Sequence, residues 1–112
     1  MNREHYMRLQ PEPFDKIRCG TKRIEVRLYD EKRQQIQKGD LITFALSDDE
    51  TKSVQVKVTD LVRFNTFSEL FRAHDPVLYG STSQDEYKSM YQYYSPADEQ
   101  KYGVLAIWLE LI

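Results

Sequence analysis

Cysteine, glycine and long apolar runs are scarce in this 112-residue sequence, which contains one cysteine, Cys19, and four glycines. A single cysteine cannot form an intramolecular disulfide, and with His5 and His74 it has no spacing typical of a metal site. No apolar run approaches the roughly 18 residues that a membrane-spanning helix needs. We therefore expect a cytoplasmic protein without a disulfide framework, a bound metal, a cofactor or a membrane partner.

A strong excess of one charge is also missing, because the formal net charge is −2. This value argues against a protein that coats nucleic acid through a strongly basic surface. The charges are uneven along the chain: residues 1–40 carry ten lysines and arginines against seven acidic residues, whereas residues 41–112 carry six against eleven. Such asymmetry is common in small domains and is only weak support for a polyanionic partner.

Apolar residues alternate in several short runs, which predicts about five strands in one domain that spans residues 1–112. The expected strands are 5–9, 23–28, 41–46, 54–58 and 104–112. Residues 41–46 and 54–58 are close enough in the chain to pair, and the long apolar run after Gly103 predicts an interior strand. With short helices between the strands, the pattern favours an α+β domain built on a small mixed β-barrel of five to six strands.

Helix starts are predicted by proline and by capping boxes. Pro11 and Pro13 are expected to begin a helix that ends near Gly20. Capping boxes at 66–69 and 83–86 predict two more helices, and Pro96 begins a short one that ends at Gly103. The helix after residue 83 is predicted to bury one face, which carries Tyr87, Met90, Tyr91 and Tyr94.

Asp60 interrupts the alternation that runs through the valines of residues 54–58. If the alternation continued to Phe64, Asp60 would lie on the apolar face, where an unpaired carboxylate costs several kcal/mol or takes up a proton. A β-bulge would turn the side chain away from that face, and barrel strands commonly bend in this manner. The pattern favours a bulge over a buried functional acid.

The segment from 19 to 28 concentrates charge within a short strand. Alternation places Ile24, Val26 and Leu28 on one face and a charged row on the other, and this row consists of Arg23, Glu25 and Arg27. Lys22 falls on the apolar side in strict alternation, so it can share a site with Glu25 only from a loop that precedes the strand. The alternative is an exposed row of ion pairs, each worth roughly 0 to 1 kcal/mol and without function.

Three short motifs follow one another in the chain: Gly-x-Lys-x-x-Glu-x-Arg at 20–27, Lys-Gly-Asp at 38–40 and Lys-Tyr-Gly at 101–103. In order and spacing they resemble the ASCH family, a branch of the PUA-like superfamily. The resemblance implies a β-barrel with flanking helices and a cleft, lined by the first motif, that binds RNA or a nucleoside-like ligand.

Some bacterial ASCH proteins are amidohydrolases that remove the acetyl group from acetylcytidine, using a lysine, a threonine and a downstream glutamate. Their lysine matches Lys22, whereas their threonine aligns with Glu25, and neither Glu69 nor Glu86 is a clean counterpart of the glutamate. A protein-interaction module that binds neither RNA nor a nucleoside is one alternative, and the resemblance leaves two further functions open. One is RNA or nucleotide binding; the other is cofactor-free hydrolysis of a modified nucleoside amide, with Lys22 and Glu25 as catalytic residues.

The predicted ligand contacts come from the charged segment and from two tyrosines. Arg27 suits a phosphate or a base edge because its planar fork donates two parallel hydrogen bonds. Tyr93 and Tyr102 lie outside the predicted helical face, and stacking of an aromatic ring on a base is worth roughly 1 to 3 kcal/mol. The full set of predicted ligand-binding residues is Lys22, Arg23, Glu25, Arg27, Tyr93 and Tyr102.

Overall fold

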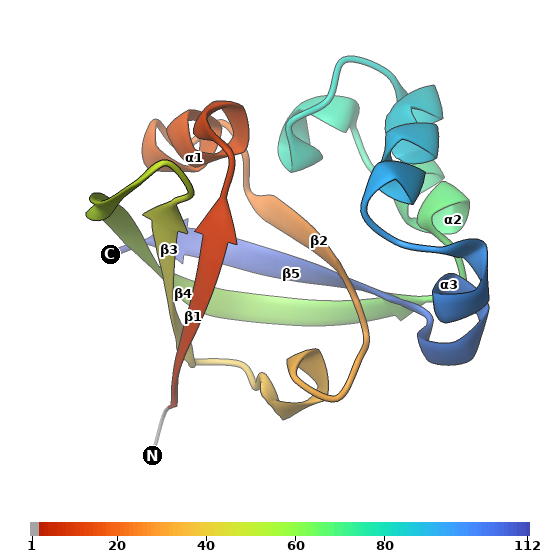
Figure 1. Cartoon of the computed structure of the whole chain (residues 1–112), viewed down its shortest axis with the longest axis horizontal. Helices are drawn as coiled ribbons and strands as arrows, with labels where there is room; N and C mark the ends of the chain where they lie inside the picture. Colours follow the sequence, from red (N-terminus) through yellow and green to blue (C-terminus); the bar gives the residue numbers. More distant parts are fainter. Residues whose placement is uncertain (1–2) are drawn as a thin grey trace.

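The computed structural model describes residues 3–112 as one strongly curled five-stranded sheet with short helices around it (Figure 1). The strands are β1 (Glu4–Leu9), β2 (Ile24–Leu28), β3 (Leu41–Leu46), β4 (Asp49–Phe64) and β5 (Val104–Leu111). Their order is β1-β3-β4-β5-β2, with β1 parallel to β3 and the other pairs antiparallel. The predicted α+β class and mixed barrel-like sheet are confirmed.

Helices cover the two ends of this half-barrel. They are α1 (Pro11–Arg18), α2 (Phe67–Arg72), α3 (Pro96–Tyr102) and the 3₁₀ helices η1 (Arg33–Gln35), η2 (Pro76–Tyr79) and η3 (Gln84–Gln92). Figure 1 shows α1 beside β1 and β3, whereas α2, η3 and α3 gather at the opposite end of the sheet. None of the helices within residues 3–112 is both long and apolar enough to cross a membrane.

A bulge bends β4, as the sequence predicted. Val58 pairs with Leu109 and Asp60 pairs with Trp108, so the register with β5 shifts between them. The extra residue turns the Asp60 side chain away from the core, where it lies 3.3 Å from the ammonium of Lys38. The bend lets the first half of β4 pair with β3 and the second half with β5, which curls the sheet.

Two apolar clusters lie on opposite faces of the curled sheet. The cluster inside the curl contains Met7, Leu9, Phe14, Ile17, Ile36, Ile42, Phe44, Val56, Val58, Leu105, Ile107 and Leu109. The cluster beneath α2 and η2 contains Ile24, Val26, Leu28, Phe67, Leu70, Phe71, Tyr79, Val104 and Ala106. Because β5 contributes to both clusters, it is covered on both faces, which explains its continuous apolar sequence.

The segment after residue 83 differs from the prediction. It forms the 3₁₀ helix η3, and no residue of η3 is fully buried. Ser83 accepts a hydrogen bond from Asp85 N, while the Glu86 carboxylate accepts from Thr82 N at 2.9 Å, so the expected reciprocal capping box is absent. A segment that lies on the surface of α2 buries less of each side chain than a helix in the core does, and Tyr91 is accordingly exposed.

Candidate ligand-binding cleft

Lys22 lies in the loop between α1 and β2, which backbone hydrogen bonds hold in place. Its N–H donates to Lys16 O at 3.0 Å, and the N–H of Arg23 donates to Leu78 O at 2.8 Å. Because β2 begins only at Ile24, the strand alternation does not apply to Lys22. The loop therefore turns the Lys22 ammonium toward the same side as Glu25.

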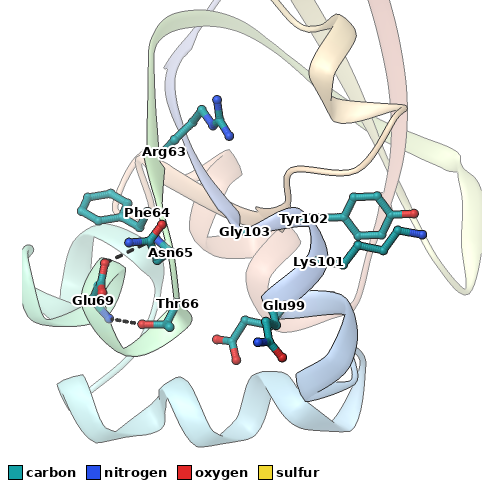
Figure 2. Close-up of a pocket in the computed structure, with 10 residues that line it drawn as sticks. Arg63, Phe64, Asn65, Thr66, Glu69, Glu99, Lys101, Tyr102 and Gly103 are labelled. Atoms are coloured by element: carbon teal, nitrogen blue, oxygen red, sulfur yellow. Dashed lines mark hydrogen bonds between the residues drawn. The ribbon is translucent and has the colours of Figure 1, made fainter.

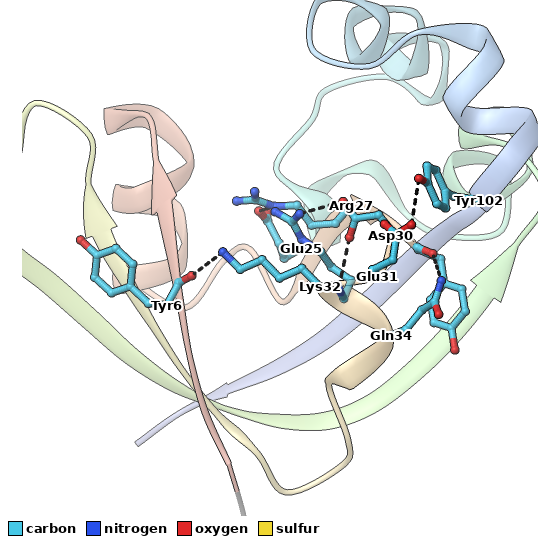
Figure 3. A network of polar contacts seen from close by, with 10 residues as sticks. Tyr6, Glu25, Arg27, Asp30, Glu31, Lys32, Gln34 and Tyr102 are labelled. Carbon is cyan, nitrogen blue, oxygen red and sulfur yellow. Dashed lines mark hydrogen bonds and ion pairs between the residues drawn. The ribbon is translucent and has the colours of Figure 1, made fainter.

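Lys22, Glu25 and Arg27 form a buried charged triad. Lys22 Nζ lies 2.8 Å from Glu25 Oε1, and Arg27 Nε lies 2.7 Å from Glu25 Oε2. The three side chains are 9%, 5% and 15% exposed respectively. Glu25 and Arg27 can be followed in Figure 3. This burial is inconsistent with the alternative of an exposed row of surface ion pairs.

The triad keeps Glu25 ionised. Burial alone would raise the pKa of Glu25, but the charges of Lys22 and Arg27 and their hydrogen bonds lower this pKa from 4.5 to about 2. Burial would lower the pKa of Arg27, yet Glu25 and then Tyr94 raise this pKa above its ordinary value. Each oxygen of Glu25 forms an ion pair, one with Lys22 and the other with Arg27, so Glu25 holds both side chains in place.

The triad forms one wall of a cleft with a volume of about 350 Å³. Small-molecule sites typically have volumes of about 300 to 1,000 Å³ and combine an apolar lining with a few placed polar groups. Apolar and aromatic lining comes from Leu9, Pro13, Val26, Phe71, Met90 and Tyr94. Tyr93 also lines the cleft and is 67% exposed, so its ring is accessible to a ligand.

A family model for the ASCH domain matches residues 7–112 of the chain. The chain belongs to the ASCH domain family. The crystal structure of the hypothetical protein PH0355 is similar, with 39% identity and a TM-score of 0.84 over 97% of this chain and 99% of that protein. The solution structure of PF0455 from Pyrococcus furiosus has 32% identity and a TM-score of 0.74 over 97% of both chains. No curated protein matches the chain.

A more distant structure shares the fold alone. The crystal structure of a mutant of ZmASCH from Zymomonas mobilis is 14% identical, with a TM-score of 0.68. The match covers 94% of this chain and 66% of ZmASCH. Together with the family match, this likeness shows that the curled sheet and its surrounding helices are an ASCH fold.

The structure brings only part of the predicted residue set into the cleft of this ASCH domain. Lys22, Glu25, Arg27 and Tyr93 line it, but Arg23 and Tyr102 do not. Arg23 is exposed and precedes the first residue of β2, so the predicted face shared with Glu25 does not extend to it. The Tyr102 hydroxyl instead donates to Glu31 Oε1 at 3.1 Å, outside the cleft (Figure 3).

Two cleft residues were not predicted to be functional. Tyr94 was expected in the core; it is half-buried against Phe67, with 5.7 Å between the ring centroids, and it also lines the cleft. Arg8 on β1 lines the cleft, and its carbonyl accepts from Arg27 Nη2 at 3.2 Å. Both contacts join segments that are distant in the sequence, and no local pattern indicates them.

A second and larger hollow of about 650 Å³ lies at the end of β4, between Thr66 and Glu99 (Figure 2). Its buried carboxylate is already satisfied within the protein, because Glu99 accepts from Phe67 N at 2.7 Å and from the Tyr91 hydroxyl at 2.9 Å. We therefore place the candidate site at the smaller cleft, which contains the charged triad. Among residues 3–112, no three His, Cys, Asp or Glu side chains are grouped so that they could hold a metal ion.

The absence of a side chain at Gly80 leaves room for Lys22, and Gly80→Ala is expected to weaken the triad. Gly80 has a φ of +84°, and a Cβ atom there would lie 3.1 Å from Lys22 Cδ. We expect Gly80→Ala to lower the free energy of unfolding by more than about 1 kcal/mol, from backbone strain and from displacement of Lys22. Gly39→Ala is the matched control because Gly39 has a similar φ of +89° in a turn outside the cleft. If urea unfolding shows that Gly80→Ala and Gly39→Ala lose the same free energy of unfolding, the contact with Lys22 contributes nothing to the loss.

Proposed function

We propose that this ASCH domain binds a nucleobase or nucleotide, in single-stranded RNA or free in solution, within the cleft. The observation that carries the proposal is the buried triad of Lys22, Glu25 and Arg27 beside accessible aromatic rings. Two cations and one carboxylate leave this wall with a net charge of +1. A ligand rich in hydrogen-bond acceptors fits such a wall better than a cationic or purely apolar ligand does.

The cations of the triad retain donors for a ligand. An ammonium has three N–H donors and a guanidinium has five. Lys22 uses one contact for Glu25, while Arg27 contacts Glu25 and Arg8 O. The remaining donors suit carbonyl oxygens of a base or oxygens of a phosphate. Because Glu25 fixes both side chains, little conformational entropy is lost when a ligand binds.

Tyr93 and Tyr94 supply the aromatic surface that a base requires. Tyr94 is held against Phe67 inside the cleft, while Tyr93 is largely exposed beside it. Stacking of a base on such a ring is worth roughly 1 to 3 kcal/mol and tolerates different bases. These contacts support nucleic-acid binding without strong sequence preference.

The geometry favours binding over amide hydrolysis in which Glu25 activates water. A general base is most effective when its pKa is near the working pH. The pKa of Glu25 is about 2, and both carboxylate oxygens lie in ion pairs with Lys22 and Arg27. Glu25 is therefore a weak proton acceptor at neutral pH and a strong positioning group.

NMR titration of the labelled protein with cytidine, N4-acetylcytidine and a short single-stranded RNA tests the proposal. We expect Lys22→Ala and Arg27→Ala each to weaken binding at least about tenfold, because a hydrogen bond from a charged group contributes about 1.5 to 3 kcal/mol. Arg23→Ala is the matched control, since Arg23 carries the same charge but does not line the cleft. We expect it to change the affinity by less than about twofold.

Two outcomes would contradict binding as the function. One is unchanged affinity for all three ligands in folded Lys22→Ala and Arg27→Ala variants. The other is release of acetate from N4-acetylcytidine that Lys22→Ala abolishes, which would identify a hydrolase. Both are measured in the same samples, and the amide spectrum of each variant reports whether it is folded.

A further inference from the structure

The two edge strands of the curled sheet are β1 and β2 (Figure 1), and we call the boundary between them the seam. Within residues 3–112, β1 pairs only with β3 and β2 pairs only with β5. On the β3 side of β1, the carbonyl of Leu9 accepts from Ser47 N at 2.8 Å. In a parallel pair the peptide groups of alternate residues point to opposite edges, so Tyr6 and Arg8 direct theirs into the seam.

Two cationic side chains cross this seam. Lys32 Nζ donates to Tyr6 O at 3.3 Å, and Arg27 Nη2 donates to Arg8 O at 3.2 Å. Figure 3 shows the Lys32 side chain extended toward β1, next to Arg27 and Glu25. The two carbonyls are two residues apart on one strand, which corresponds to about 7 Å.

The seam continues directly from the cleft. Arg8 and Arg27 line the cleft, and Lys32 lies next along the seam, with its ammonium at the backbone carbonyl of Tyr6. The side chains of Arg8, Lys32 and Tyr6 are exposed, so a second molecule can reach them. Three cations, together with the exposed ring of Tyr93 in the adjoining cleft, form the combination that single-stranded nucleic acid binds.

We infer that the seam, along which Arg8, Arg27 and Lys32 lie, is a track for the sugar-phosphate backbone of single-stranded RNA. The inference rests on the proposed function, since the track holds the nucleotides next to the one in the cleft. Lys32 contacts one phosphate and Arg8 contacts another. The preferred ligand is therefore an oligonucleotide and not a free nucleoside.

Glu50 on β4 neutralises the charge of Arg8 at the border of this track. It forms an ion pair with Arg8 and accepts from the Tyr6 hydroxyl at 3.2 Å. Both Glu50 and Arg8 are more than half exposed in their side chains, and exposed pairs of this kind are weak. A phosphate can therefore replace the carboxylate. Removal of the Glu50 charge is expected to strengthen the binding of RNA.

The charges favour RNA over an extended peptide that would add a strand to β1. A peptide strand would need the carbonyls of Tyr6 and Arg8 as acceptors, but these carbonyls already accept from Lys32 and Arg27. Cationic side chains at a sheet edge also oppose strand addition. The same cations attract a polyanion.

The test compares a fluorescent octanucleotide RNA with cytidine, using fluorescence anisotropy and NMR titration. Loss of one phosphate contact lowers the salt slope for a single strand by about 0.7, which is about a fivefold loss of affinity at about 0.1 M salt. We expect this loss for the octanucleotide with Lys32→Gln, little change for cytidine, and recovery with Lys32→Arg. Glu50→Gln should tighten octanucleotide binding severalfold. Lys57→Gln is the control, because it removes the same charge from an exposed lysine on β4, away from the seam.

The outcomes separate the seam from the cleft. If cytidine binds but Lys32→Gln and Lys57→Gln affect the octanucleotide equally, the seam inference is wrong and the cleft proposal stands. If neither ligand binds the wild-type protein, both are wrong. If an acidic peptide binds in a manner that requires Lys32 while the octanucleotide does not bind, the seam is a protein-binding edge and the inference is overturned.

Discussion

Replacement of Glu25 by glutamine is expected to lower the free energy of unfolding by about 3 kcal/mol at neutral pH. The neutral amide leaves Lys22 and Arg27 close together without a counterion, and both are largely buried. Loss of one partner from a buried ion pair typically costs about 3 to 5 kcal/mol. Urea unfolding measures the change. Glu12→Gln, which removes the carboxylate of the exposed pair with Lys16, should change stability by less than about 0.5 kcal/mol.

Protonation of Glu25 at low pH should remove the stabilisation that its charge gives to the wild-type protein. The pKa of Glu25 is about 2 in the folded protein, below its ordinary value of 4.5, so the folded state binds this proton more weakly than the unfolded state does. The stabilisation is complete above pH 4.5 and disappears as the pH falls through about 2. The difference corresponds to about 3 kcal/mol. If the difference in unfolding free energy between wild type and Glu25→Gln stays constant over this pH range, the stabilisation does not come from the charge of Glu25.

Replacement of Phe67 by alanine is expected to cost about 3 to 5 kcal/mol of folding stability, the usual range for a fully buried phenylalanine. Phe67 is 0% exposed and lies at the start of α2. Its ring stacks against Tyr94 and meets the edge of Tyr91, with centroid distances of 5.7 and 6.0 Å. The substitution therefore removes the support of the cleft wall, and the affinity for RNA should fall together with stability.

Tyr93→Ala separates these two effects. Tyr93 lines the cleft but is largely exposed, so its removal should change the free energy of unfolding by less than about 0.5 kcal/mol. Loss of one stacked base should nevertheless weaken RNA binding by about 1 to 3 kcal/mol. Urea unfolding and anisotropy titration of both variants measure the two quantities. RNA affinity that is unaffected by Tyr93→Ala would exclude this ring as a stacking surface.

The charged segment shows how far local patterns could predict the candidate site. The motif identified Lys22, Glu25 and Arg27, and the loop position that Lys22 requires is the one it occupies. Strand alternation also placed Arg23 beside Glu25, but β2 begins after Arg23, and its side chain lies outside the cleft. Alternation holds only within a strand, and a pattern of residue types does not define the first paired residue to that accuracy.

The strands, the bulge at Asp60 and the ASCH family follow from order along the chain, because side-chain alternation and motif spacing are properties of adjacent residues. The cleft and the seam do not follow from the order of residues along the chain. Arg8 meets Arg27 only because the bent β4 curls the sheet and brings its two edges together. Tyr93 and Tyr94 reach the cleft only because η3 packs on α2 as a 3₁₀ segment. These contacts depend on how distant elements pack, and packing energy overrides local helix preference.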